Sequence, residues 1–428
     1  MSPQQRLARL QEIDRALGKA SRRIRVLRHL TWPAEAEAEF LSSWRAGRPE
    51  LPSIELAPPS YSDEIATLRE LADRCDRADP LGALLQRSAR SYITAARMLE
   101  GIGTPQFTAC STALYGAPDT PWASQTFTGV DAAEHLLAVT DRLLGNYAMP
   151  PTVYDIPAEV FAERLRAAID PFFTEDRVEV VLDDDLSSKA IASSKRIRVR
   201  KSALFSELDL DQLVHHEAFI HSGTKLNGMR QPHLEVLGLG TPRTTRAQEG
   251  LAVLAELMTL SIGIRRLRRI AVRVKAAKLA LDGGDFIDVF RCFLEAGQTE
   301  EESFQSAQRI FRGGDVRGGV AFTKDSAYLR GLLEMHTFLR IAIRDNRPEL
   351  AERIFAGRLT LADVVLLDEA FADGTLIGPR YVPAWARDLR RVAAAAAFSG
   401  FVAEIELEAV QLDAVVTVEE RLEASADI

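Results

Sequence analysis

The sequence predicts a mainly α fold (α+β), in which a small antiparallel sheet lies beside a central helix. Apolar residues recur at helical spacing through most of the 428-residue chain. Two short β-rich runs stand in the middle, at residues 177–185 and 195–203. The stretch that follows them, SELDLDQLVHHEAFIH, has the pattern of a helix that begins near Ser206 or Asp209. These observations place the sheet directly before the central helix.

The first 63 residues read as a helix followed by an extended arm. Residues 4–30 carry apolar side chains roughly at helical spacing. The Pro- and Ser-rich segment 51–63 is typical of a linker or an extended arm. We therefore divide the chain into an N-terminal part, residues 1–63, and a larger domain, residues 64–428.

The larger domain is expected to be helical on both sides of the sheet. The run KRIRVR alternates Ile197 and Val199 with arginines, as a half-buried strand does. A helix should begin near Thr245, which forms a capping-box pattern with Gln248. Further helices are expected at 64–78, 81–102 and 131–145, and helices dominate 285–410.

Composition excludes several classes of protein. The net charge is −8, from 53 basic and 61 acidic side chains, which argues against a nucleic-acid partner. No apolar run is long enough to span a membrane, and the N-terminal segment lacks the apolar core of a signal peptide. The 3 cysteines are far apart and fit neither a disulfide framework nor a cysteine zinc site. We expect a cytoplasmic protein.

Two histidines and two glutamates suggest a catalytic zinc site. His216 and Glu217 are adjacent, His221 follows, and Glu249 lies in the first turn of the next expected helix. A catalytic zinc takes three protein ligands and keeps one position open, and two His with one Glu is a known set. Glu217 could then act as the general base. This pattern predicts zinc as the cofactor, held by His216, His221 and Glu249.

The spacing of the two histidines requires a distorted helix. The usual form is H-E-x-x-H, whereas this chain has HEAFIH, with one more residue between the histidines. On a regular α-helix, five residues turn through about 500°, which leaves the two side chains about 140° apart. A π-type turn would bring them back to one face, and such turns gather at functional sites. We therefore expect a π-bulge or a helix break between His216 and His221.

Other histidines remain alternatives to this ligand set. His215 is six residues from His221, which is a poorer spacing for a shared ion, and a packed or supporting role suits it better. His233, in the connecting loop, is the remaining rival ligand.

The segment AQEGLAVLAELM, residues 247–258, resembles the signature of the bacterial QEGLA-motif family. That family is similar to the microtubule-associated tyrosine carboxypeptidases, which remove the C-terminal tyrosine of tubulin. The resemblance covers most of the chain, through WPAEAEAEF, GTPQFTACSTALYGAPD, DDLSSKA with KRIRVR, HEAFIH, IFRGGDVRGGVAFTKDSAYLRGLLE and GPRYVPAW. It implies that residues 64–428 are a zinc metallocarboxypeptidase-like catalytic domain.

The resemblance also implies the roles of individual residues. The family carries zinc on H-E-x-x-x-H and on the Glu of QEGLA, which here are His216, His221 and Glu249, with Glu217 as the base. It implies hydrolysis at the C-terminal tail of a peptide or protein, with release of an aromatic residue. The family usually has Gly-Thr before the second histidine, where this chain has Phe219 and Ile220.

An exopeptidase must also neutralise the terminal carboxylate of its substrate, and Arg or Lys does this best. Arg309, Arg312, Arg317 and Lys324 lie in the Gly-rich stretch QRIFRGGDVRGGVAFTKD and are candidates. Tyr328, four residues after Lys324, could stabilise an oxyanion. Arg196 is a further candidate if substrate adds as a strand to an exposed edge formed by KRIRVR.

A second hypothesis is a regulatory or scaffold protein without catalysis, in which the metal is structural or absent. The enzyme hypothesis requires one zinc per chain and release of a C-terminal residue from peptides. A fully folded, metal-free protein would favour the scaffold.

Overall fold

The computed structural model describes residues 2–121, 127–145, 147, 150–184, 186, 189–193 and 195–402. The chain forms two compact units, one of residues 1–383 and one of residues 384–428. Among the described helices, none combines the length and the apolar character needed to cross a bilayer. The boundary expected at residue 63 stays a prediction.

Most of the larger unit is helical, as the sequence predicts. Its first helices are α1 (Pro3–Ser21), α2 (Val26–His29), α3 (Glu35–Arg45), α4 (Ser62–Arg74), α5 (Pro80–Glu100), α6 (Pro105–Tyr115), α7 (Gly129–Leu144) and α8 (Ala158–Ile169). The central and later ones are α9 (Glu207–Gln212), the π-helix η1 (Leu213–Ser222), α10 (Gly223–Met229), α11 (Thr245–Met258), α12 (Ile264–Leu281), α13 (Phe286–Glu295), α14 (Glu300–Phe311), α15 (Ser326–Arg344), α16 (Pro348–Arg353), α17 (Leu361–Leu366) and α18 (Asp368–Ala372). Short 3₁₀ turns are η2 (Glu235–Gly238), η3 (Pro242–Thr244) and η4 (Thr323–Asp325).

The N-terminal helix is shorter than expected. It ends at Ser21, and α2 follows after a break, whereas the periodicity predicts one helix over 4–30. The hydroxyl of Tyr61 donates a hydrogen bond of 3.2 Å to the carbonyl of Arg23. That carbonyl lies in the break, so a tertiary contact stabilises an interruption that periodicity alone does not reveal. The segment before α4 is extended, as predicted.

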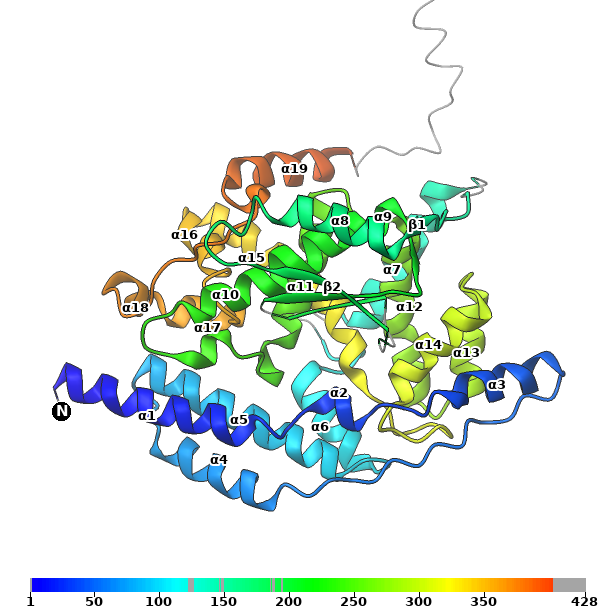
Figure 1. The fold of residues 1–428 in the computed structure, drawn as a ribbon, viewed down its shortest axis with the longest axis horizontal. Helices are drawn as coiled ribbons and strands as arrows, with labels where there is room; N and C mark the ends of the chain where they lie inside the picture. The colour runs from blue at the N-terminus through cyan, green and yellow to red at the C-terminus, as the bar shows by residue number, and fades with distance from the viewer. Residues whose placement is uncertain are drawn as a thin grey trace, which may run out of the picture. The chain divides into compact units, whose positions relative to one another are not determined.

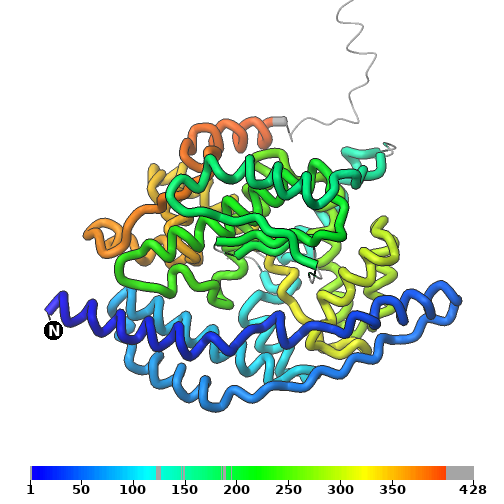
Figure 2. Tube along the Cα trace, in the orientation of Figure 1, coloured from blue at the N-terminus to red at the C-terminus, as the bar shows by residue number. Residues whose placement is uncertain are grey.

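Helices near the N-terminus pack against later helices of the same unit. Helices α1, α4 and α5 contact one another, and α3 contacts α14 (Figure 2). Phe40 of α3 lies in an aromatic cluster with Phe286, Phe290 and Phe304, at ring-centroid distances of 5.0, 4.9 and 5.5 Å. This burial of large apolar side chains holds α3 against α13 and α14.

The sheet beside the central helices is mixed, which corrects the antiparallel arrangement expected from the sequence. Its strands are β2 (Glu179–Asp183), β3 (Ala190–Ala192) and β4 (Arg196–Arg200), in the order β2–β4–β3. Strand β3 pairs antiparallel with β4, but β2 pairs parallel with it, Val180 opposite Ile197. The chain reverses twice between β2 and β4, so these two strands run the same way. A separate antiparallel pair joins β1 (Ile156–Pro157) to β5 (Leu204–Phe205).

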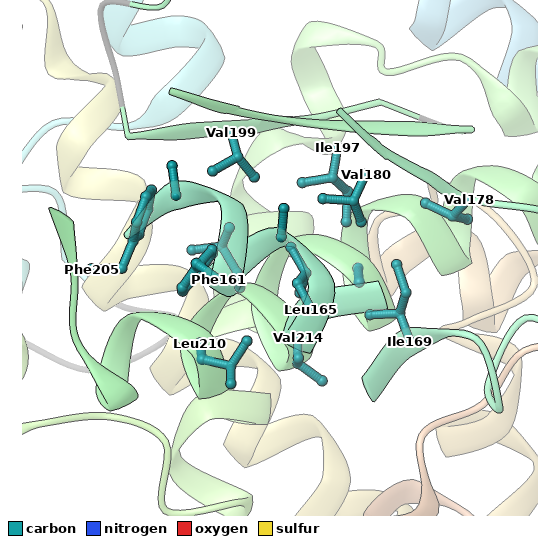
Figure 3. Packing of buried hydrophobic residues seen from close by; sticks show 14 of the residues in the cluster. Phe161, Leu165, Ile169, Val178, Val180, Ile197, Val199, Phe205, Leu210 and Val214 are labelled. Carbon is teal, nitrogen blue, oxygen red and sulfur yellow. The ribbon is translucent and has the colours of Figure 1, made fainter. Parts of the chain in front are cut away.

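One face of the mixed sheet packs on α8 and the central π-helix. Figure 3 shows Val180, Ile197 and Val199 of the strands pointing towards Phe161 and Leu165 of α8. Val214 of η1 belongs to the same buried cluster. Helix α11 in turn packs against η1 and along α15 (Figure 1). The sheet therefore packs on the apolar side of η1, the helix that carries His216 and His221.

The smaller unit contains the 3₁₀ turn η5 (Ala384–Ala386) and helix α19 (Leu389–Val402) in its described part.

Candidate metal centre

A π-helix aligns the two histidines, as their spacing predicts. Ser206 begins α9 through a capping box with Asp209, and the helix then widens into η1. Because π-helical bonding joins residues five apart, His216 and His221 return to one face. Their ring centroids lie 4.8 Å apart.

The bulky residues between the histidines face away from the metal position. Phe219 stacks on Phe172, with ring centroids 4.0 Å apart, and packs against the buried cluster under the sheet. Ile220 is 0% exposed. Phe219 therefore packs into the core under the sheet, and Ile220 is buried as well.

Glu249 reaches the same point from α11. Its Oε2 lies 3.7 Å from Nε2 of His216 and 3.8 Å from Nε2 of His221. The three ligand atoms lie within 4.8 Å of one another. Tetrahedral zinc with bonds of about 2.0–2.1 Å requires separations of about 3.3 Å, so the three side chains would have to move closer together to bind it. Two imidazoles and a carboxylate therefore fit the donor set of a catalytic zinc.

A close helix crossing fixes the position of Glu249. The next residue, Gly250, lies against Gly331 of α15, where an added Cβ would stand 2.2 Å from the Gly331 backbone. Only glycine permits this approach. Gln248, on the other side of Glu249, accepts a hydrogen bond of 2.8 Å from Thr224 of α10. It makes no capping box with Thr245, because the N-cap of α11 is Thr244 and has no side-chain cap.

A buried ion pair holds His216 from behind. Nδ1 of His216 lies 2.6 Å from Oε1 of Glu256, which is 0% exposed. Glu256 in turn accepts hydrogen bonds of 2.6 and 2.7 Å from Arg266 of α12. This contact makes Nδ1 the donor and leaves Nε2 free to bind a metal.

Lys324 holds the outer oxygen of Glu249. Its Nζ lies 2.9 Å from Oε1, so Oε2 alone faces the histidines. Burial would raise the pKa of Glu249, but Lys324 and the two histidines hold the pKa well below its usual range. Burial would lower the pKa of His216, yet Glu249 and Glu256 raise this pKa to about 10. The carboxylates thus favour positive charge at this point.

Glu217 is more exposed than His216, His221 and Glu249. Its side chain is 29% exposed, and Oε1 lies 3.9 Å from Nε2 of His216. It is therefore beside the metal position with access to solvent, as a general base requires.

The rival histidines lie outside this group. His215 packs at right angles to the ring of Phe219, with centroids 5.4 Å apart. Nδ1 of His233 lies 3.3 Å from Nε2 of Gln11. Among the residues that the structure describes, the group of His216, His221 and Glu249 is the one that meets metal-ligand distances.

The other predicted substrate-binding residues fall into two places. Tyr328 of α15 is buried, and its ring lies 5.4 Å from Nζ of Lys324. Arg309 donates two hydrogen bonds, of 2.7 and 2.8 Å, to Asp325, and Arg312 lies over the ring of Phe322 at 5.4 Å. These residues lie close to η4, whereas Arg317 is 78% exposed and pairs with Asp315.

Arg196 lies on β4, where it is exposed and 3.4 Å from Glu179. The hypothesis that KRIRVR forms an exposed edge is wrong, because β4 is the central strand and pairs on both sides. The two-sided pairing follows from β3, which folds back onto β4 and covers the edge that β2 leaves free.

Sequence reasoning missed the residues that support the site from α12. Arg266, Arg269 and Arg273 follow the i, i+3, i+7 spacing of one helix face. Glu256 is likewise seven residues after Glu249, on the same side of α11. Both spacings are visible in the sequence, but their partners come from other helices.

The sequence also matches a known protein family. A family model described as microtubule-associated tyrosine carboxypeptidase matches residues 38–404. No curated protein matches the chain.

Proposed function

The chain belongs to the microtubule-associated tyrosine carboxypeptidase family, and we propose that it is a zinc-dependent carboxypeptidase. Family membership implies activity of the carboxypeptidase type. The zinc dependence, the site residues and the released residue are our proposal.

The convergence of His216, His221 and Glu249 carries this proposal. Three side chains from two helices place their ligand atoms within 4.8 Å of one another. A π-helix is needed to achieve this. Such helices are rare and frequently mark functional sites. The donor set suits zinc and leaves a coordination position for catalysis.

The protein residues divide the work of hydrolysis. When bound, zinc would polarise the scissile carbonyl and acidify a water molecule. Glu217 takes the proton from the attacking water and transfers it to the leaving amine. Glu256, through His216, keeps the ligand ring oriented. Tyr328 remains our candidate for stabilising the oxyanion.

The proposed substrate is the C-terminal tail of a peptide or protein. The description of the family names tyrosine, so an aromatic residue is the first choice for the released amino acid. Incubation of zinc-loaded protein with peptides of varied C-termini, followed by mass spectrometry, tests this directly.

Replacing the general base separates catalysis from metal binding. Glu217→Gln should abolish turnover and still bind one zinc per chain, because Glu217 is not a ligand. Glu207→Gln, an exposed residue of α9 paired with Arg164, is the matched control and should remain active. Wild-type turnover by Glu217→Gln would show the mechanism to be wrong, and a folded protein that binds no zinc would favour a scaffold.

A further inference from the structure

Arginines from two helices gather beside the candidate metal centre. Arg269 and Arg273 come from α12, and Arg309 and Arg312 come from the end of α14. Arg309 and Arg273 both approach Asp325 of η4, with Nε atoms 2.7 and 3.5 Å from its Oδ2. We call Arg269, Arg273, Arg309 and Arg312 the arginine cluster.

The hydrogen bonds of this cluster are unevenly shared. Arg309 takes both oxygens of Asp325. The Nε atoms of Arg269, Arg273 and Arg312 are buried and have no hydrogen-bond partner among the described residues. Arg269 lies 3.7 Å from Glu302. The buried carboxylate of Asp325 therefore lies close to two guanidinium groups, and Arg309 donates the hydrogen bonds to both of its oxygens.

Buried cations whose N–H groups are incompletely hydrogen-bonded are unfavourable for folding. Burial and the neighbouring Arg309 lower the pKa of Arg273 to about 9 and that of Arg312 to about 10. Buried groups with strongly perturbed pKa values are frequent at functional sites. The cluster therefore suits an anionic ligand group.

The ring of Tyr328 lies close both to Lys324, beside the candidate metal centre, and to Arg273 of the arginine cluster. The ring of Tyr328 has Nζ of Lys324 at 5.4 Å and Cζ of Arg273 at 5.8 Å. Lys324 itself contacts Glu249. In a C-terminal residue, the scissile bond and the free carboxylate are separated by about one residue length, roughly 3.8 Å. An anion site for that carboxylate must accordingly lie close to the metal.

We propose that Arg273 and Arg312 bind the terminal carboxylate of the substrate and thereby make the enzyme an exopeptidase. The inference rests on the proposed zinc carboxypeptidase function. It assigns Arg309 to Asp325 and Lys324 to Glu249, so these two residues position their neighbours and do not contact substrate. The planar guanidinium matches a carboxylate with two parallel hydrogen bonds, which lysine does not reproduce.

Binding to the inactive zinc-loaded Glu217→Gln protein tests the proposal without turnover. The probes are two peptides of one sequence, one with a free C-terminal carboxylate and one with a C-terminal amide. The free acid should bind about tenfold tighter or more, because the amide lacks the charge that the guanidinium groups pair with. Arg273→Met and Arg312→Met, each added to Glu217→Gln, should reduce this ratio towards one.

Thermal stability provides a second readout. Removing Arg273 or Arg312, whose Nε atoms make no hydrogen bond, should lower the melting temperature less than removing Arg309 does. Removing Arg309, which is paired with Asp325, should lower it. Arg317→Gln is the matched control, because Arg317 follows the cluster in sequence, is 78% exposed and pairs with Asp315. This variant should keep the full acid-to-amide ratio.

The outcomes separate this inference from the proposed function. A ratio that stays at the wild-type value in both Met variants would overturn the assignment of Arg273 and Arg312. Equal binding and equal cleavage of acid and amide would overturn it too, while leaving a zinc peptidase. If the unsubstituted protein cleaves neither peptide, the proposed function fails, whereas the binding ratio still tests the anion site.

Discussion

Glu256 orients His216, a proposed zinc ligand, and is not itself one of the proposed ligands. Its carboxylate lies 2.6 Å from Nδ1 of His216 and accepts a hydrogen bond from Arg266. These contacts fix the orientation of the imidazole ring. A metal ligand held in this way loses little freedom when the ion binds. In the proposed zinc site, the affinity for the metal should therefore depend on Glu256, a residue that is not a ligand.

Replacing Glu256 should weaken zinc binding, although Glu256 is not one of the three proposed ligands. We expect Glu256→Gln to reduce zinc affinity by about 10–100-fold, as loss of such supporting partners typically does. Competition with a chromophoric chelator measures this. Glu207→Gln, at an exposed ion pair, should bind zinc like the wild type. Unchanged affinity in Glu256→Gln would mean that the contact does not orient His216.

Helices α11 and α15 act as one element at the metal centre. Glu249 lies on α11, Tyr328 lies on α15, and Lys324 precedes α15 in η4. The crossing at Gly250 and Gly331 sets the distance between the two helices. Movement of one helix would separate Glu249 from Lys324.

Gly250→Ala tests this crossing. The added methyl would stand 2.2 Å from the Gly331 backbone, which cannot move aside as a side chain could. Overpacking commonly costs 1–3 kcal/mol, and we expect about 3 kcal/mol here, together with weaker zinc binding. Urea unfolding and zinc titration measure the two effects. Gly378→Ala is the control, because nothing lies within 4 Å of its added Cβ. Equal stability of the two variants would contradict the close approach.

A buried carboxylate ties α17 to η3 and makes stability depend on pH. Asp363 is 0% exposed on its side chain and lies 2.7 Å from Arg243. It also caps α17 through Thr360. Burial would raise the pKa of Asp363, but the hydrogen bond and charge of Arg243 hold this pKa below its usual 3.8. The folded state therefore binds this proton less readily than the unfolded chain does.

It follows that the contribution of Asp363 is complete above about pH 4 and declines as the pH falls through the lowered pKa. Asp363→Asn should cost about 3 kcal/mol at pH 6, and the difference from wild type should shrink towards pH 3. Urea unfolding at both pH values measures it. Asp282→Asn, at the exposed pair with Lys278, should change stability by less than about 1 kcal/mol. A difference for Asp363→Asn that does not depend on pH would contradict the ion pair.

At the scale of the whole molecule, sequence reasoning succeeds where local geometry decides. The five-residue interval between His216 and His221 allows convergence only on a distorted helix, and η1 is that helix. The position of Glu249 in the chain, after both histidines, can also be read from the sequence. The parallel pairing of β2 with β4 and the engagement of Lys324 by Glu249 depend on contacts between distant segments. Periodicity carries no information about such partners, so they emerge only from the structure.

The metal should also stabilise the larger unit, because its ligands come from both η1 and α11. An ion that binds only the folded state adds about 4 kcal/mol when its free concentration is about a thousand times the dissociation constant. We therefore expect chelation to lower the thermal midpoint and added zinc to restore it, in wild type and in Glu217→Gln alike. His221→Ala should show a smaller zinc-dependent shift, since one of the three ligands is missing. Differential scanning calorimetry with and without a chelator measures these shifts. An identical midpoint under both conditions, with no zinc retained, would remove the metal from the mechanism and with it the proposed role of Glu217.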